Sequence, residues 1–315
     1  QKNKNSCGSW VTLNGTHPLL ALVGTTASGK SYVAMELAKS VTGLEIISVD
    51  SMQIYRGMNV GTAKPSEEDL RLVPHHMIDL VDPHEEFTIS EFQKEAKKVL
   101  NTLQQRKSTP LLVGGTGLHL RTIIDNLTIP SQYPQARSEI ESEPDTEKLY
   151  TQLQDLDSLA ASRIEKNNRR RIVRALEVTV GSEKKFSSYG PGLQQYPESE
   201  YKLYGLRWSR EAIDRRILER YEWQLKNGFF DEVQRLSQSS KGISRTASQA
   251  LGYKQFLEHL RGNLSFDEAL EKAIIDTKKF ARKQERWFRR DPRINWIEIK
   301  QDPLEAVPIL MKEYR

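Results

Sequence analysis

Short apolar runs alternate with stretches of helical periodicity over the first 125 residues. The runs have the length and the apolar composition of strands buried in a parallel sheet, and they lie at Pro18–Val23, Leu44–Val49 and Pro110–Val113. Between the runs, Val33, Leu37 and Val41 recur every four residues, and a second helical pattern extends from Thr88 to Gln105. Strands that alternate with helices predict an α/β fold with a doubly wound parallel sheet.

This pattern stops near residue 126 and returns near residue 201. The segment 126–200 has no strand-like runs and reads as polar and mostly helical, interrupted by prolines. Tyr201–Trp208 and Asn295–Ile299 then predict two further strands, and Ala269–Arg290 predicts a long helix. We therefore expect a P-loop NTPase-like core formed by 17–125 and 201–315, an inserted helical domain at 126–200, and a disordered tail at 1–16.

Composition places the chain among soluble globular proteins. Of its 315 residues 37% are hydrophobic and 28% charged, with a mean hydropathy of -0.62. No apolar run approaches the roughly 20 residues that span a bilayer, and Gln1–Thr16 carries no signal-peptide pattern. Cys7 is the single cysteine, which excludes an internal disulfide and a cysteine-rich zinc module. We expect a cytoplasmic monomer.

The most specific pattern is G-T-T-A-S-G-K-S, which fits the P-loop consensus and follows the first predicted strand. Its residues are Gly24, Thr25, Thr26, Ala27, Ser28, Gly29, Lys30 and Ser31. In this context the backbone amides of the loop and of the next helix point at phosphate oxygens. Lys30 adds a positive charge, and the Ser31 hydroxyl is placed to bind Mg²⁺. The pattern predicts a phosphate site with Mg²⁺ as its cofactor.

The other predicted strands end in residues of chemical interest. Asp50 follows the second strand, where it could act as a base, hold Mg²⁺ through water, or cap the next turn. Gly114–Gly117 (GGTG) follows the Pro110–Val113 strand and allows close approach of another backbone. His75 and His76 lack a third ligand at a suitable spacing, so they favour a structural role over a metal site.

Two groups of cations indicate an anionic partner. Arg169, Arg170, Arg171 and Arg174 gather at the start of a predicted helix, where the macrodipole disfavours them. In this helix Ile172, Leu176 and Val180 share an apolar face. In the Ala269–Arg290 helix a stripe of Lys279, Arg282, Lys283, Arg286 and Arg290 runs beside a core face that includes Phe280. Nucleic acid is the expected partner, and the alternative is a solvated charged surface.

Together these segments resemble the tRNA dimethylallyltransferases, also called tRNA isopentenyltransferases. The resemblance extends in order from about residue 18 to 300. It is carried by GTTASGKS, by DSMQIYRGMNVGTAK at 50–64, by PHHMID at 74–79, by GGTG, by RIVRALE at 171–177, by GFFDEV at 228–233 and by ALGYK at 250–254.

The resemblance implies transfer of a dimethylallyl group from dimethylallyl diphosphate to the N6 amine of an adenosine in tRNA. That adenosine lies immediately 3′ of the anticodon and must leave the base stack to react. Thr26–Ser31 would bind the diphosphate, Arg220 would stabilise the departing charge, and Asp50 would accept the amine proton. Thr116 is the third catalytic residue that the resemblance implies.

By the same resemblance, residues from six segments would contact the anticodon stem-loop. They are Asp50, Ser51, Met52, Gln53 and Thr116 at the base, and Arg137, Arg170, Arg171, Ile172, Val173, Arg174, Gln249, Ala250, Leu251, Gly252, Tyr253 and Lys254 at the neighbouring RNA, with Lys279, Arg282, Lys283 and Arg286 at the stem. The inserted domain and the basic helix would hold the stem through its phosphates and its shape.

The chain departs from the family pattern at two positions. Thr25 stands where proline is usual, which changes loop stiffness rather than phosphate chemistry. His119 stands where tyrosine is common, which alters stacking there. The sequence contains no zinc finger of the eukaryotic type, as expected of a bacterial or organellar form.

Two other functions share part of this pattern. An adenylate isopentenyltransferase, which acts on free nucleotides, would use the P-loop and the aspartate but would not need the two cationic groups. A small-molecule kinase or an ATP-driven RNA-binding switch would need a second acidic strand end to hold Mg²⁺, whereas the Pro110–Val113 strand ends in glycines.

Overall fold

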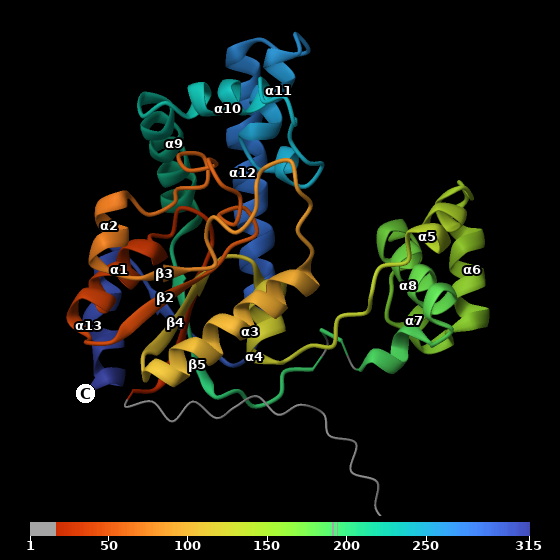
Figure 1. Ribbon diagram of the computed structural model, residues 1–315, viewed down its shortest axis with the longest axis horizontal. Helices are drawn as coiled ribbons and strands as arrows, with labels where there is room; N and C mark the ends of the chain where they lie inside the picture. Colours follow the sequence, from red (N-terminus) through yellow and green to blue (C-terminus); the bar gives the residue numbers. More distant parts are fainter. Residues whose placement is uncertain (1–16, 191, 194) are drawn as a thin grey trace, which may run out of the picture. The chain divides into compact units, whose positions relative to one another are not determined.

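The computed structural model describes residues 17–190, 192–193 and 195–315, so the predicted tail at 1–16 lies outside it. Contacts divide the chain into two compact units (Figure 1). The first contains the described residues up to Ile124 together with Glu198–Arg315, and the second is Asp125–Pro197. The expected insertion at 126–200 lies close to these bounds.

A six-stranded parallel sheet forms the centre of the first unit, in the order β3-β2-β4-β1-β5-β6. The strands are β1 (Leu19–Gly24), β2 (Leu44–Val49), β3 (His75–His76), β4 (Thr109–Gly114), β5 (Tyr201–Arg207) and β6 (Ile294–Glu298). Every residue of β1, β2 and β4 is buried, as their apolar sequences predict. The expected α/β fold with a parallel sheet is confirmed.

The register of the three central strands brings their carboxyl ends side by side. Gly114 of β4 pairs with Val23 of β1 and with Val49 of β2. The P-loop, Asp50 and the GGTG turn therefore begin at neighbouring points on one edge of the sheet, which is the edge where ligands bind in open α/β folds.

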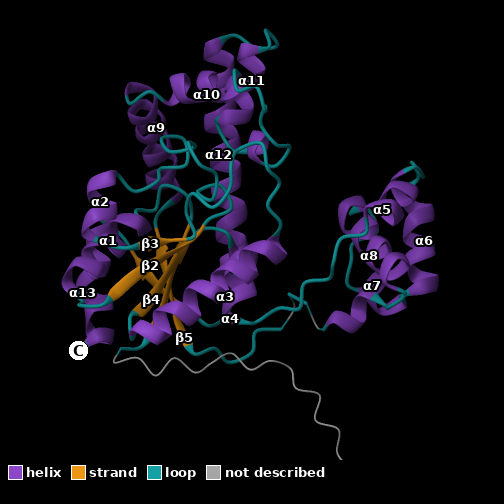
Figure 2. Ribbon diagram, in the orientation of Figure 1, coloured by secondary structure: helices purple, strands orange, loops and turns teal. Residues whose placement is uncertain are grey.

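Helices cover both faces of this sheet, as Figure 2 shows: α1 and α13 lie on one face, and α3, α4 and α12 on the other. The helical segments of this unit are α1 (Lys30–Ser40), α2 (Glu67–Leu72), α3 (Ile89–Arg106), α4 (Gly117–Ile124), α9 (Arg210–Lys226), α10 (Phe229–Ser237), η2 (Ala247–Gln249), α11 (Tyr253–Leu260), α12 (Phe266–Phe288), η3 (Pro303–Ala306), α13 (Val307–Leu310) and η4 (Met311–Tyr314). Because α9 and α11 both pack against α12, α12 joins them to the sheet.

The second unit is helical and has its own apolar core. Its helices are α5 (Pro134–Glu141), α6 (Thr146–Leu156), α7 (Ser158–Ser162), α8 (Arg169–Ser182) and the 3₁₀ turn η1 (Phe186–Tyr189). Leu149, Leu153, Ile172 and Leu176 belong to the core. In α8, however, Val180 is exposed, so the predicted apolar face ends one turn earlier.

Two further details differ from the sequence prediction. Phe280, expected in the core, is exposed on α12, where Ala273, Thr277 and Ala281 fill the buried stripe. The third strand in the chain comprises the two histidines themselves, where the apolar runs predicted no strand. His76 Nε2 hydrogen-bonds Glu45 Oε2 at 2.7 Å, so this histidine joins the edge strand β3 to β2.

Candidate active site

The P-loop connects β1 to α1 and is fixed from outside by side chains of other elements. Gly29 has φ of +84°, which glycine adopts without strain, and α1 begins at Lys30. Arg216 Nε donates to the Ala27 carbonyl at 2.7 Å, and Trp208 Nε1 donates to the Ser28 carbonyl at 3.0 Å. These bonds direct the carbonyls of the loop toward the protein body, and sequence reasoning missed both of them.

Lys30 lies in a cluster of charges at this loop. Its Nζ donates to the Thr25 carbonyl at 3.2 Å. Burial lowers the pKa of Lys30 to about 8, an effect that the Asp50 carboxylate opposes and Arg220 strengthens. Three residues that the sequence placed in the site therefore interact electrostatically in the structure. The cluster has two cations and one carboxylate, which suits a polyanionic ligand.

The lowered pKa leads to a prediction on stability. Between about pH 8 and the ordinary lysine value of 10.5, the unfolded chain holds the Lys30 proton and the folded chain does not. Folded-state stability therefore rises with pH across this window, and the cost of burying the charge is present in full below pH 8. We expect Lys30→Met to raise the melting temperature at pH 7 and to abolish pyrophosphate binding.

Thermal unfolding from pH 7 to 10.5 measures this effect, and calorimetry measures pyrophosphate binding. The difference in melting temperature between Lys30→Met and the unmodified protein must become smaller as pH rises. Lys226→Met, which alters an exposed lysine in the last turn of α9, is the control and should bind pyrophosphate like the unmodified protein. A Lys30→Met protein that melts lower at pH 7 would contradict the prediction.

Asp50 caps the turn that follows β2 and keeps one oxygen free. Its Oδ1 accepts hydrogen bonds from the amides of Met52 at 2.8 Å and Gln53 at 3.3 Å. Its Oδ2 has no hydrogen-bond partner among the described residues. The capping role and a chemical role are therefore compatible, because they use different oxygens of a carboxylate with a fixed orientation.

Arg220 of α9 reaches across the site to two loops. Its Nη1 donates to the Thr26 hydroxyl at 3.1 Å, and its Nη2 donates to the Gly61 carbonyl at 3.2 Å. Burial lowers the pKa of this guanidinium, which nevertheless stays charged because arginine begins so high. Arg220 thus places a permanent positive charge beside the P-loop.

The loop that holds Arg220 is itself fixed by a buried carboxylate. Glu232 of α10 accepts hydrogen bonds from the amides of Asn59, Val60 and Gly61, at 2.8, 3.0 and 3.2 Å respectively. The Tyr253 hydroxyl donates to the same carboxylate. Nothing in the local sequence indicates this role, because the partners are about 170 residues apart.

The remaining predicted base-contact residues lie at the same edge. The Ser48 hydroxyl donates to Gln53 Oε1 at 2.7 Å, and Gln53 Nε2 donates to the carbonyls of Thr62 and Ala63. The Thr116 amide donates to the Val49 carbonyl at 3.4 Å, which sets the GGTG turn beside the end of β2. Ser51, Met52 and Thr116 are partly exposed.

A cavity of about 270 Å³ opens beside Ser31, between α1 and the segment 63–69. Its apolar wall includes Met35, Ile46 and Val113, and its polar wall includes Gln53 and Lys64. The cavity therefore adjoins both the P-loop and the turn after β2, and it offers an apolar surface next to Ser31.

Comparisons with known proteins identify the family of this chain. A model of the IPP transferase family matches residues 53–291. The tRNA dimethylallyltransferase of Carboxydothermus hydrogenoformans is 41% identical over 295 residues, which cover 92% of this chain and 94% of the relative. The chain belongs to the IPP transferase family. The tRNA dimethylallyltransferase of Desulforudis audaxviator is 38% identical over 288 residues, which cover 90% of this chain and 93% of the relative.

Solved structures of IPP transferases have the same fold. The tRNA isopentenylpyrophosphate transferase of Staphylococcus epidermidis is 33% identical with a TM-score of 0.68, covering 94% of this chain and 98% of its own. That of Bacillus halodurans is also 33% identical, with a TM-score of 0.67 and coverage of 94% and 96%. A eukaryotic dimethylallyltransferase acting on tRNA matches at 24% identity and a TM-score of 0.75, over 89% and 73% of the two chains, and this match concerns the fold alone.

In this IPP transferase, several arginines of the group that we expected at the RNA bond to other residues of the helical unit. Glu177 is buried in that unit, and it pairs with Arg174 at 2.7 Å and with Arg137 at 3.5 Å. Arg169 donates to the backbone carbonyls of Glu141, Glu143 and Pro144. Arg170 and Arg171 are exposed and have no ion-pair partner in the part of the chain that the structure describes.

Several other predicted RNA contacts involve residues that are buried in this structure. The side chains of Ile172, Val173, Ala250 and Tyr253 are buried in apolar cores, and Gly252 is buried too, so no side chain of these residues faces solvent. These residues pack below the surface and support the exposed residues of the same segments. Leu251 is partly exposed, and Gln249 and Lys254 are exposed.

The cationic stripe of α12 is only partly free. Arg282 pairs with Asp214 of α9 at 3.0 Å, and Lys279 pairs with Asp276 at 3.6 Å. Lys283 and Arg286 are exposed, and neither has an ion-pair partner within the described ranges. Arg290, the last residue of the stripe, is also exposed and has no ion-pair partner among the described residues, so the stripe offers three positions with uncompensated charge.

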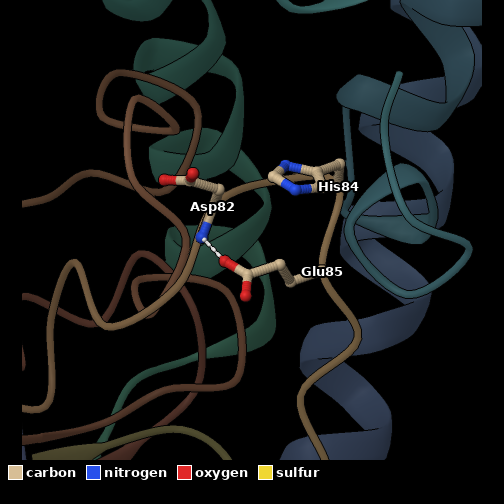
Figure 3. Close-up of side chains that lie close together, drawn as sticks. All are labelled: Asp82, His84 and Glu85. Carbon is tan, nitrogen blue, oxygen red and sulfur yellow. Dashed lines mark hydrogen bonds between the residues drawn. The ribbon is translucent and has the colours of Figure 1, made fainter. Parts of the chain in front are cut away.

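Asp82, His84 and Glu85 lie close together, with ligand atoms within 4.8 Å of one another (Figure 3). Glu85 Oε2 accepts from the Asp82 amide at 2.7 Å, and Asp82 pairs with Arg56 at 3.1 Å. Both carboxylates thus have partners in the loop, so the group is explained without a metal. Within the described residues, no helix combines the length and apolarity that a membrane crossing requires.

Proposed function

We propose that this chain transfers a dimethylallyl group from dimethylallyl diphosphate to the N6 amine of the adenosine 3′ of the anticodon in tRNA, and that it releases diphosphate. The observation that carries the proposal is the convergence at one sheet edge of Lys30 and Arg220 with the fixed carboxylate of Asp50. Two cations beside a P-loop suit a diphosphate leaving group, and the carboxylate suits an amine nucleophile.

The chemical step requires one bond to form and one to break. The N6 nitrogen attacks C1 of the allyl group, the C1–oxygen bond breaks, and the electron pair leaves on the diphosphate. Asp50 Oδ2 accepts the N6 proton, which becomes acidic because the nitrogen gains positive charge as it bonds to C1. Arg220 and Lys30 stabilise the charge on the departing oxygens, and their positions are fixed before the reaction, which avoids a reorganisation cost.

Mg²⁺ fits the donor atoms at this site. The Ser31 hydroxyl makes no hydrogen bond to another described side chain, so its oxygen is available as a ligand. Hydroxyl and phosphate oxygens are the hard ligands that Mg²⁺ prefers. When bound, the ion would neutralise part of the diphosphate charge.

The exposed cations of α12 support the tRNA substrate. Because a protein–phosphate contact releases counterions, each contact adds about 1 to the slope of log affinity against log salt. We expect the double variant Lys283→Gln, Arg286→Gln to bind tRNA more weakly and to lower this slope by about 2. Filter binding at salt concentrations from about 50 to 200 mM tests this expectation.

The control for this measurement is Arg71→Gln, Lys98→Gln. It removes the same charge from exposed positions on α2 and α3. An unchanged slope in the α12 variant, or an equal loss in the control, would place the RNA elsewhere.

Incubation with dimethylallyl diphosphate and either tRNA or AMP tests the function. We expect prenylated adenosine in tRNA and diphosphate in equal amounts. Prenylation of AMP without tRNA would favour an adenylate isopentenyltransferase. ATP hydrolysis stimulated by RNA, without prenyl transfer, would favour a nucleotide-driven switch.

A further inference from the structure

Gln284 of α12 joins the two loops on which the two substrates would bind. Its Oε1 accepts a hydrogen bond from the Thr26 amide of the P-loop at 2.8 Å. Its Nε2 donates to the Gly115 carbonyl of the GGTG turn at 2.8 Å. Gln284 is 8% exposed, and its bond to Gly115 is buried, whereas its bond to Thr26 is partly buried.

The fit around this side chain is close. A Cβ atom on Gly115 would lie 2.4 Å from Gln284 Nε2, and one on Gly117 would lie 1.9 Å from Trp287 Nε1. The GGTG turn therefore needs glycine at these positions because α12 packs directly against it. Packing of this kind holds the turn at one distance from the helix.

The first loop is held just as firmly. Thr26 donates its amide to Gln284, and its hydroxyl accepts from Arg220. Because β1 and β4 are neighbouring strands, the two loops that Gln284 links follow adjacent carboxyl ends of the sheet. One amide side chain thus connects the P-loop, where the prenyl donor would bind (the donor loop), to the GGTG turn, where the acceptor adenosine would bind (the acceptor turn). Through Thr26 it is also linked to Arg220, which would stabilise the leaving group.

We propose that Gln284 is a positioning residue that fixes the donor loop relative to the acceptor turn. The inference rests on the proposed function, since it assumes that the diphosphate binds at the P-loop and the adenosine at the GGTG turn. It assigns to the buried face of α12 a role in alignment, whereas the sequence indicated only a role for its exposed face.

The physical consequence follows from the geometry of displacement. Attack at C1 requires the amine and the leaving oxygen on opposite sides of the carbon, with reacting atoms about 3–3.5 Å apart. If the link is lost, each substrate still meets its own binding groups, but the two are misaligned. Turnover falls, and water has more opportunity to attack the activated allyl carbon.

Gln284→Met keeps the length of the side chain and removes both hydrogen bonds. We expect kcat for tRNA prenylation to fall about 10- to 100-fold, with KM for both substrates changed much less. The fraction of dimethylallyl diphosphate lost to dimethylallyl alcohol should rise. Gln284→Glu keeps the acceptor for Thr26 and loses the donor to Gly115, so it should show the same uncoupling.

Thr277→Val is the matched control. Thr277 is buried on the same helix and hydrogen-bonds the Tyr221 hydroxyl at 2.9 Å, away from both loops. It should lower the melting temperature without changing kcat or the alcohol fraction. Gln284 variants with wild-type kcat, or a kcat loss in all three variants that follows their melting temperatures, would overturn the inference. Absence of prenyl transfer by the unmodified chain would instead refute the proposed function.

Discussion

Replacing Asp50 by asparagine lowers kcat for prenyl transfer by about 100- to 10,000-fold, the range that a positioned general base contributes. Asparagine keeps an oxygen in the place of Oδ1, so the hydrogen bonds from Met52 and Gln53 and the turn they form remain. What is lost is the free Oδ2, which we propose accepts the amine proton. Binding of tRNA and of pyrophosphate should be nearly unchanged.

Single-turnover prenylation and separate binding measurements distinguish these effects. Asp145→Asn is the control, because Asp145 caps α6 through the amides of Glu147 and Lys148, and asparagine also caps. A variant at Asp50 that turns over within a few-fold of the unmodified chain would remove this residue as the base. A variant that no longer binds tRNA would give Asp50 a binding role in place of the chemical one.

Replacing Arg220 by alanine lowers kcat by about 100- to 1,000-fold, as expected when a fixed donor to developing negative charge is removed. The guanidinium contacts both Thr26 and Gly61. Its loss therefore also removes one hydrogen bond that holds the segment 59–61, whose amides remain bound to Glu232. KM for dimethylallyl diphosphate should rise as well. Arg220→Lys keeps the charge and should recover part of kcat, but a single ammonium replaces the planar guanidinium that spans the two loops.

Arg215→Ala provides the comparison on the same helix. Arg215 is exposed and lies 4.0 Å from Glu219, so its loss should leave kcat and KM unchanged. If Arg220→Ala changed KM alone, the arginine would bind the donor equally in the ground state and the transition state. The role in leaving-group stabilisation would then be wrong.

The sequence was sufficient for the core of the fold because the signals are local. The apolar runs at β1, β2 and β4 are buried strands, and β2 has the predicted bounds. The P-loop spacing and the position of Asp50 at a strand end are also local features. Parallel pairing then brings them to one edge, as Val23, Val49 and Gly114 show.

Long-range polar contacts could not be predicted in this way. Glu232, Gln284 and Trp208 act on loops more than 100 residues away, and each could equally have been a solvated or packing residue. The arginines of α8 show the same limit. Their clustering indicates a binding surface, but the partners of Arg169 and Arg174 are carbonyls and a buried glutamate of the same unit.

The central claim is that one sheet edge holds the diphosphate and the amine on opposite sides of the allylic carbon. A crystal structure with an unreactive thiodiphosphate analogue of the donor and an anticodon stem-loop tests it most directly. We predict diphosphate oxygens bound to Lys30 and Arg220, and the adenosine N6 hydrogen-bonded to Asp50 Oδ2 about 3–3.5 Å from C1. A diphosphate bound away from Lys30, or an adenosine that does not reach Asp50, would contradict it.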